Sequence, residues 1–196
     1  MSLTFRWIEK IKAKQPEFRD EKLERYKKEF DIPQYDAEIL TESKHMADIF
    51  EETTAICGKP KKVSNWLMVE TMRLLKEYGM EPEDISFSPA NLAKLIGLTE
   101  AGTINSSVAK EVFEQVFEKD VDPESYVEEH GLKTVNDEGA LEEVLKEVIA
   151  KNPKAIADYK GGKEKALGAL VGQTMKTMKG KANPGMVNQK LREMLK

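Results

Sequence analysis

The chain has 196 residues, of which 40% are apolar, 34% charged and 7% aromatic. This balance favours a helical protein with a large surface over a β-sandwich or a barrel. The single cysteine, Cys57, excludes an internal disulfide and a cysteine-built zinc site.

The apolar runs are too short to cross a membrane, and no signal peptide is visible before the chain becomes charged at Arg6. Together with the cysteine usage, these features predict a cytoplasmic protein that does not associate with membranes.

The net charge of −4 conceals an uneven distribution. Residues 1–150 hold 20 Lys and Arg against 32 Asp and Glu, a net of −12, whereas residues 151–196 hold 11 against 3, a net of +8. This asymmetry predicts an acidic body and a basic tail that meets an anionic partner. A solvated basic surface without a partner is the alternative interpretation.

Helical spacing of apolar residues continues through nearly the whole chain and predicts an all-α fold. In the first part, helices are predicted at residues 17–29, 35–57, 65–78, 88–97 and 104–118, with a further short helix after Asp122-Pro123. Ser64 is the predicted N-cap of the third helix, and Ser88-Pro89 begins the fourth with a cap-then-proline signature.

The segment 118–136 is the predicted joint between a helical domain, residues 1–130, and a C-terminal tail domain, residues 131–196. In the tail, an amphipathic helix ends at Asn152-Pro153 and a short helix or turn follows. A longer helix is predicted at residues 162–179, and Asn183-Pro184 begins the last one.

The sequence contains no recognisable catalytic or metal-binding group of residues. It has neither a Walker-type phosphate loop nor a Gly-x-Gly-x-x-Gly motif. Cys57 has no nearby histidine and is expected to be a buried or half-buried apolar residue. His45 lies on a charged helix and is expected to be solvated, whereas His130 is expected at a helix end, where its charge suits the dipole.

Residues 92–113 could form a helix-turn-helix around Gly102. A DNA reader needs donors at the leading exposed positions of its second helix, and here these positions hold Asn105, Ser106, Ser107 and Lys110. They lie in the acidic half of the chain, which repels a phosphate backbone. Plain helical packing is therefore favoured, and no DNA partner is expected.

The helix predicted at 162–179 carries two glycines in its interior, Gly168 and Gly172, each of which costs about 0.8–1 kcal/mol relative to alanine. A helical projection gathers small and basic residues within about 60° of one direction, opposite the apolar side: Lys165, Gly168, Ala169, Gly172, Lys176 and Lys179. Such a strip suits either the close approach of another helix or the approach of a phosphate–sugar backbone. The bordering lysines favour the second interpretation.

Three segments are distinctive: "NWLMVETMRLL", "LAKLIGLTEAGTINSSVAKEVF" and, most specifically, "NPKAIADYKGGKEKALGALVGQTMKTMKGKANPGMVNQKLREML". They resemble the GatB/YqeY family, the B subunits of aspartyl/glutamyl-tRNA amidotransferases. The earlier "LERYKKEFDIPQYDAEILT" resembles the helical domain of these subunits, which the short free-standing YqeY-like proteins lack. Ala169 stands where family tails often have phenylalanine, so base stacking is not expected there.

The resemblance implies a role in amidating Glu-tRNA(Gln) or Asp-tRNA(Asn), with ammonia supplied by a partner amidase. It places ATP and Mg²⁺ in an N-terminal catalytic domain that this chain lacks. No cofactor is then expected here, and the chain alone is expected to be inactive. The implied partners are tRNA and two further subunits of the amidotransferase, the amidase and the small subunit.

The combined prediction is that the tail positions misacylated tRNA for transamidation. The candidate tRNA contacts are Lys160, Lys163, Lys165, Gly168, Gly172, Lys176, Lys179 and Lys181, and no catalytic or metal-binding residue is assigned. The alternative is a YqeY-type module of helices that binds proteins without contacting RNA.

Overall fold

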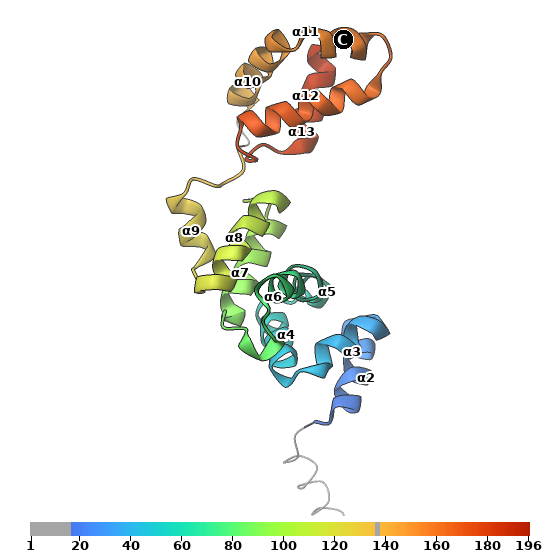
Figure 1. The fold of residues 1–196 in the computed structure, drawn as a ribbon, viewed down its shortest axis with the longest axis vertical. Coiled ribbons are helices and arrows are strands. Elements are labelled where there is room, and N and C mark those ends of the chain that lie inside the picture. The colour runs from blue at the N-terminus through green and yellow to red at the C-terminus, as the bar shows by residue number, and fades with distance from the viewer. Residues whose placement is uncertain (1–16, 136–137) are drawn as a thin grey trace, which may run out of the picture. The chain divides into compact units, whose positions relative to one another are not determined.

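The computed structural model describes residues 17–135 and 138–196, so the segment around Arg6 lies outside the described part. These residues form helices joined by short turns, and no strand occurs among them, which confirms the predicted all-α fold (Figure 1). The chain divides into two compact units, one ending at Ile85 and the other spanning Ser86–Lys196.

The first unit packs its helices around an aromatic centre. The rings of Tyr26 and Phe50, both fully buried, have centroids 4.7 Å apart. The elements of this unit are α2 (Arg19–Phe30), α3 (Gln34–Glu42), α4 (Lys44–Cys57), α5 (Pro60–Asn65), the π-helix η1 (Trp66–Thr71), α6 (Met72–Tyr78) and the 3₁₀ turn η2 (Pro82–Asp84).

Two expectations for this unit are wrong. The helix predicted at 35–57 is broken at Ser43, whose backbone is extended and whose hydroxyl accepts a hydrogen bond from the Met46 N–H at 3.2 Å. Ser64 is no N-cap, because the helix already begins at Pro60 and Ser64 is buried inside it. Proline is pre-organised for the first helical position, which explains why the helix starts at Pro60.

The second unit begins with α7 (Pro89–Glu100), α8 (Ser106–Lys119) and α9 (Pro123–Glu129). The predicted starts of α7 and α9 are confirmed, because the side chains of Ser88 and Asp122 accept hydrogen bonds from the first turn of the helix that follows. Helix α8 begins two residues later than predicted, with Asn105 as its N-cap. The apolar residues of α8 that recur at helical spacing are buried: Val108, Val112, Phe113, Val116 and Phe117.

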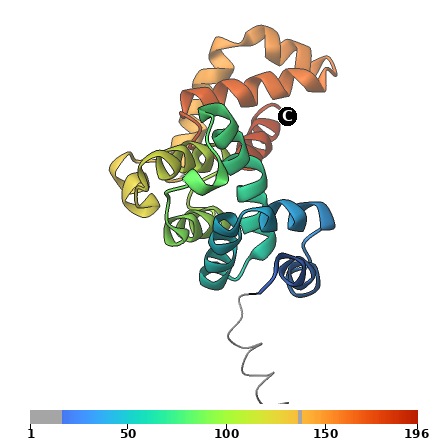
Figure 2. The ribbon, with the colours of Figure 1, turned by 60° about the horizontal axis from the view of Figure 1, so that its bottom comes forward.

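The same unit continues into four tail helices, drawn in orange to red in Figure 2: α10 (Glu138–Lys151), α11 (Pro153–Lys160), α12 (Glu164–Thr177) and α13 (Pro184–Met194). Their common core consists of Leu141, Leu145, Val148, Leu167, Leu170, Ala182, Val187, Leu191 and Leu195. Asn183 caps α13 as predicted, accepting from the N–H groups of Gly185 and Met186.

The predicted domain boundary between residues 130 and 131 falls within the second unit, directly after α9. It stays a prediction. None of the helices in the described part of the chain combines the length and the apolar character that a membrane span requires.

Candidate nucleic-acid interface

Helix α12 separates its apolar side from a smooth exposed side. Leu167, Leu170 and Thr174 are buried against the tail core, whereas Gly168 and Gly172 are exposed. A Cβ atom built on either glycine would meet no other atom within 4 Å. No described helix of the second unit therefore packs against these glycines, and internal helix packing does not explain their presence in α12.

Two lysines border the glycines on this exposed side. Lys165 and Lys176 are both exposed, and in the described residues neither has an acidic group within ion-pair distance. Their positions, eleven residues apart, span about 16 Å of helix axis. We call the exposed side formed by Lys165, Gly168, Ala169, Gly172, Gln173 and Lys176 the glycine–lysine face.

Gln173 belongs to this face although the sequence analysis did not select it. It is exposed and lies one turn after Ala169. The sequence signal for this placement is the i+4 spacing from Ala169. Its side-chain amide adds a neutral hydrogen-bond donor to a surface otherwise made of lysine and bare backbone.

The acidic residue of α12 pairs with a cation of α13. Glu164, in the first turn, accepts from the Arg192 guanidinium of α13 at 2.8 Å. That hydrogen bond, followed by the positive charge of Arg192, lowers the pKa of Glu164. The one carboxylate of α12 therefore pairs with Arg192, and neither Lys165 nor Lys176 is its partner.

Lys160 and Lys163 lie at the N-terminal end of α12. Lys160 is the exposed last residue of α11, and Lys163 is the N-cap residue of α12. The Lys163 ammonium pairs with the Asp158 carboxylate at 3.1 Å. This pairing makes Lys163 the least available cation among the predicted contacts.

Lys179 and Lys181 lie beyond the other end of the helix. The predicted helix was too long: α12 ends at Thr177, and Lys179 adopts a left-handed conformation with φ of 52°. Lys179 is exposed, but it is not part of the glycine–lysine face on which the projection placed it. Lys181 is half-buried, and its carbonyl accepts from the Val135 N–H at 2.8 Å.

The helix-turn-helix interpretation gains no support from Asn105. Its side-chain oxygen accepts from the Val108 N–H at 2.9 Å, and its amide nitrogen donates to the carbonyls of Gly180 and Ala182. Both ends of the side chain are used inside the second unit. Asn105 therefore cannot reach a base edge without first giving up these bonds.

The two histidines and the cysteine that were considered as catalytic candidates are half-buried or lie within hydrogen-bonding distance of backbone carbonyls. His45 is half-buried instead of solvated, because its Nε2 lies 2.7 Å from the Ile85 carbonyl oxygen. His130 ends α9 as predicted, and its Nδ1 lies 2.9 Å from the Tyr126 carbonyl oxygen. Cys57 is half-buried, as expected.

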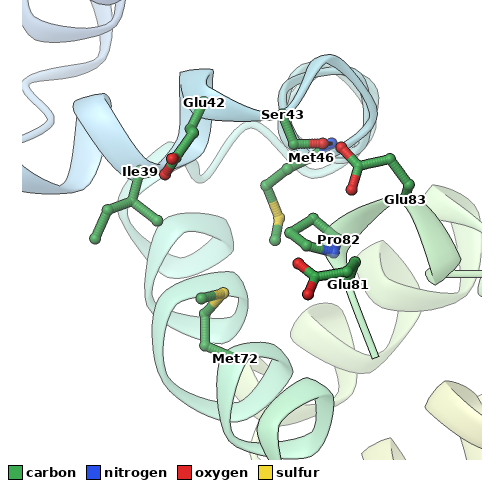
Figure 3. A pocket seen from close by; sticks show the side chains of 8 residues that line it. All are labelled: Ile39, Glu42, Ser43, Met46, Met72, Glu81, Pro82 and Glu83. Carbon is green, nitrogen blue, oxygen red and sulfur yellow. Dashed lines mark hydrogen bonds between the residues drawn. The ribbon is translucent and has the colours of Figure 1, made fainter. Parts of the chain in front are cut away.

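A pocket of about 320 Å³ in the first unit is lined in part by carboxylates (Figure 3). Ile39, Met46, Met72 and Pro82 form its apolar part, and the carboxylates of Glu42, Glu81 and Glu83 surround it. None of these three carboxylates has an ion-pair partner among the described residues. Because its rim is negative, the pocket disfavours a phosphate-bearing ligand.

No group suited to a metal emerges from the part of the chain that the structure describes. Nowhere in residues 17–135 and 138–196 do three His, Cys, Asp or Glu side chains gather closely enough to hold an ion. The glycine–lysine face therefore remains the candidate site that geometry and charge support best.

Comparison with known proteins gives a family match over most of the chain. The model of the GatB domain family matches residues 48–195. The B subunit of the aspartyl/glutamyl-tRNA(Asn/Gln) amidotransferase from Agathobacter rectalis is 69% identical over 189 residues, covering 96% of this chain and 40% of that protein. The protein of the same name from Lachnospira eligens is 60% identical over 196 residues, covering 97% of this chain and 41% of that protein.

A more distant relative, from Thermodesulfovibrio yellowstonii, carries the same name and is 48% identical over 190 residues, or 97% of this chain and 40% of its own length. The chain thus spans about 40% of the length of the curated relatives that it matches.

Proposed function

The chain belongs to the GatB domain family, and from this premise we propose that it is the tRNA-binding part of a B subunit of the aspartyl/glutamyl-tRNA(Asn/Gln) amidotransferase. In this proposal the tail holds misacylated Glu-tRNA(Gln) or Asp-tRNA(Asn) while the amide is formed. The relatives are named as enzyme subunits, so the proposed protein partners are the amidase and the small subunit of the same enzyme.

The glycine–lysine face carries this proposal. Phosphate contacts come from lysines and from backbone that the nucleic acid can approach closely. The face offers Lys165 and Lys176 without acidic partners in the described residues, and open space above Gly168 and Gly172. Lys160, Lys179 and Lys181 extend the positive charge beyond both ends of α12, with Lys163 as a paired and weaker contributor.

ATP and Mg²⁺ do not fit the described residues. These residues form no metal-binding cluster, and the sequence has no phosphate loop. We therefore assign both cofactors to parts of the related proteins outside the stretch that this chain matches. On this assignment the chain alone catalyses no amide formation.

A mobility-shift assay with tRNA(Gln), tRNA(Asn) and a non-cognate tRNA tests the proposal. Gly172→Glu places a negative charge in the middle of the glycine–lysine face and should weaken tRNA binding at least about tenfold, through repulsion and lost approach. Gly97→Glu is the matched control, because Gly97 is also exposed inside a helix, with open space around its Cβ position.

The proposal predicts a large effect for Gly172→Glu and a small one for Gly97→Glu, with both variants folded by circular dichroism. Equal affinities for the unchanged chain and for Gly172→Glu would overturn the assignment of this face.

A protein-binding role is the second candidate, and the first unit supplies the observation that favours it. Tyr35 and Val69, 69% and 52% exposed, line a hollow of about 470 Å³ beside α3 and η1. Pull-down with the amidase and the small subunit, using the full chain and Gly172→Glu, separates the two roles. Loss of protein capture in Gly172→Glu would show that the glycine–lysine face binds a partner protein and not RNA.

A further inference from the structure

Three successive carbonyl groups in the tail turn after α12 accept hydrogen bonds from residues that precede the tail helices. Those of Gly180 and Ala182 accept from the Asn105 side-chain amide, the second at 3.4 Å. The carbonyl between them, of Lys181, accepts from the Val135 N–H at 2.8 Å. Carbonyls that follow a helix have no partner within it, so such external donors hold the turn in place.

The residues next to these hydrogen bonds are themselves buried or hydrogen-bonded. Ala182 is fully buried and belongs to the tail core, while Ile104, next to Asn105, is 1% exposed. On the other side, the Thr134 N–H donates to the Thr103 carbonyl at 2.7 Å. Residues 103–105, 134–135 and 180–182 therefore form one hydrogen-bonded cluster.

Asparagine suits position 105 for a chemical reason. Its oxygen caps α8 by accepting from the Val108 N–H, while its NH₂ group donates to the turn. Aspartate or serine can cap a helix equally well, but a carboxylate has no hydrogen to donate and a serine hydroxyl is too short to serve both tasks. The capping role alone does not require the donor.

We propose that Asn105 is a positioning residue, a clasp that fixes the Lys179–Ala182 turn to the start of α8. The turn carries Lys179 and Lys181 beyond the C-terminal end of the glycine–lysine face. With the clasp closed, these two lysines keep a fixed direction relative to that face. The clasp itself stands on the hydrogen bonds, whereas its role in RNA binding rests on the proposed function.

Asn105→Asp in the full chain tests the clasp, because it keeps the cap of α8 and removes the donor. The measured quantity is the hydrogen-exchange rate of the Val135 amide, whose acceptor is the Lys181 carbonyl. We expect exchange about tenfold faster, the effect of losing hydrogen bonds of ordinary strength. Affinity for tRNA should fall several-fold in the same variant.

Asn183→Asp is the matched control, because Asn183 also caps a helix of the second unit. In the described residues its amide nitrogen donates no hydrogen bond. This variant adds the same charge and should leave the Val135 exchange rate unchanged. An unchanged rate in Asn105→Asp, or an equal rise in both variants, would overturn the clasp.

The exchange rate of Val135 tests the clasp, and tRNA binding by the unchanged chain tests the proposed function, so either proposal can be refuted without the other. Faster Val135 exchange in Asn105→Asp without any tRNA binding by the unchanged chain would keep the clasp and refute the proposed function. Normal tRNA binding by the unchanged chain, together with an unaltered Val135 exchange rate in Asn105→Asp, would refute the clasp and keep the proposed function. If Asn105→Asp loses its helical circular dichroism signal, Asn105→Ser, which keeps a cap without adding charge, decides the question by the same exchange measurement.

Discussion

Gly168 and Gly172 weaken α12, and nothing in the described part of the second unit compensates for this weakening. Both lie in the helix, neither has a positive φ, and a Cβ atom would fit at both positions. Glycine is required where the backbone needs an unusual conformation or where another molecule comes close. Since the conformation is ordinary helix, the close approach of an RNA backbone in the proposed function would account for both glycines.

Gly168→Ala and Gly172→Ala should therefore each raise the free energy of unfolding by about 0.8–1 kcal/mol, the difference in helix propensity. Under the proposed function, the same methyl groups hold the RNA backbone away and lower tRNA affinity. Chemical denaturation and a mobility shift measure the two effects. Gly97→Ala, on α7, should give a similar gain in stability with no change in affinity.

Ser64 is a second residue whose surroundings do not match its chemistry. It is 3% exposed, and its hydroxyl has no hydrogen-bond partner among the described residues. An unpaired buried hydroxyl is unfavourable, and serine is a weaker helix former than alanine. Ser64→Ala should raise the free energy of unfolding by about 1 kcal/mol, measured by urea denaturation. A loss of stability would show that a water molecule or a partner satisfies the hydroxyl.

At the scale of the element, Ser43 separates α3 from α4 and caps the second of them. Removing such a cap typically costs about 1 kcal/mol. Ser43→Ala should lower the free energy of unfolding by about this amount, because the Met46 N–H loses its acceptor in a site that is 7% exposed. Ser107→Ala, exposed in the first turn of α8, should change it by less than about 0.5 kcal/mol.

Helix starts were predictable where two local signals coincide. Ser88, Asp122 and Asn183 each combine a capping side chain with a proline at the next position, and all three begin helices. Ser43 lacks the proline and lies within a continuous apolar period, so the break there was not visible. Ser64 resembled a cap, but Pro60 had already started that helix.

The exposed side of α12 was predictable because burial follows the helical period. The end of that helix was not predictable from the sequence, because the left-handed backbone at Lys179 depends on the conformation of the turn that follows the helix. The bonds from Asn105 to Gly180 and Ala182 join residues 75 and 77 positions apart. Periodicity reports which side of a helix is buried, but it does not report which distant carbonyl a side chain reaches.

At the scale of the whole molecule, the structure shows which lysines of the basic tail are paired with carboxylates. Two lysines of α10 are paired with carboxylates on the same helix, Lys146 with Glu142 at 3.5 Å and Lys151 with Glu147. The glycine–lysine face carries lysines without such partners in the described residues. Lys165 and Lys176 therefore leave positive charge available to a polyanion on one side of α12, although the chain as a whole has a net charge of −4.

This distribution predicts how tRNA binding depends on salt. Neutralising about four phosphates releases their counterions, so raising the salt from about 50 to about 200 mM should weaken binding roughly 100-fold. The double variant Lys165→Gln/Lys176→Gln removes two of these contacts and should reduce the same salt effect to roughly tenfold. Lys146→Gln/Lys151→Gln removes two paired lysines of α10 and should leave the salt effect unchanged. A flat salt response, or equal slopes for the two double variants, would contradict an electrostatic interface on α12.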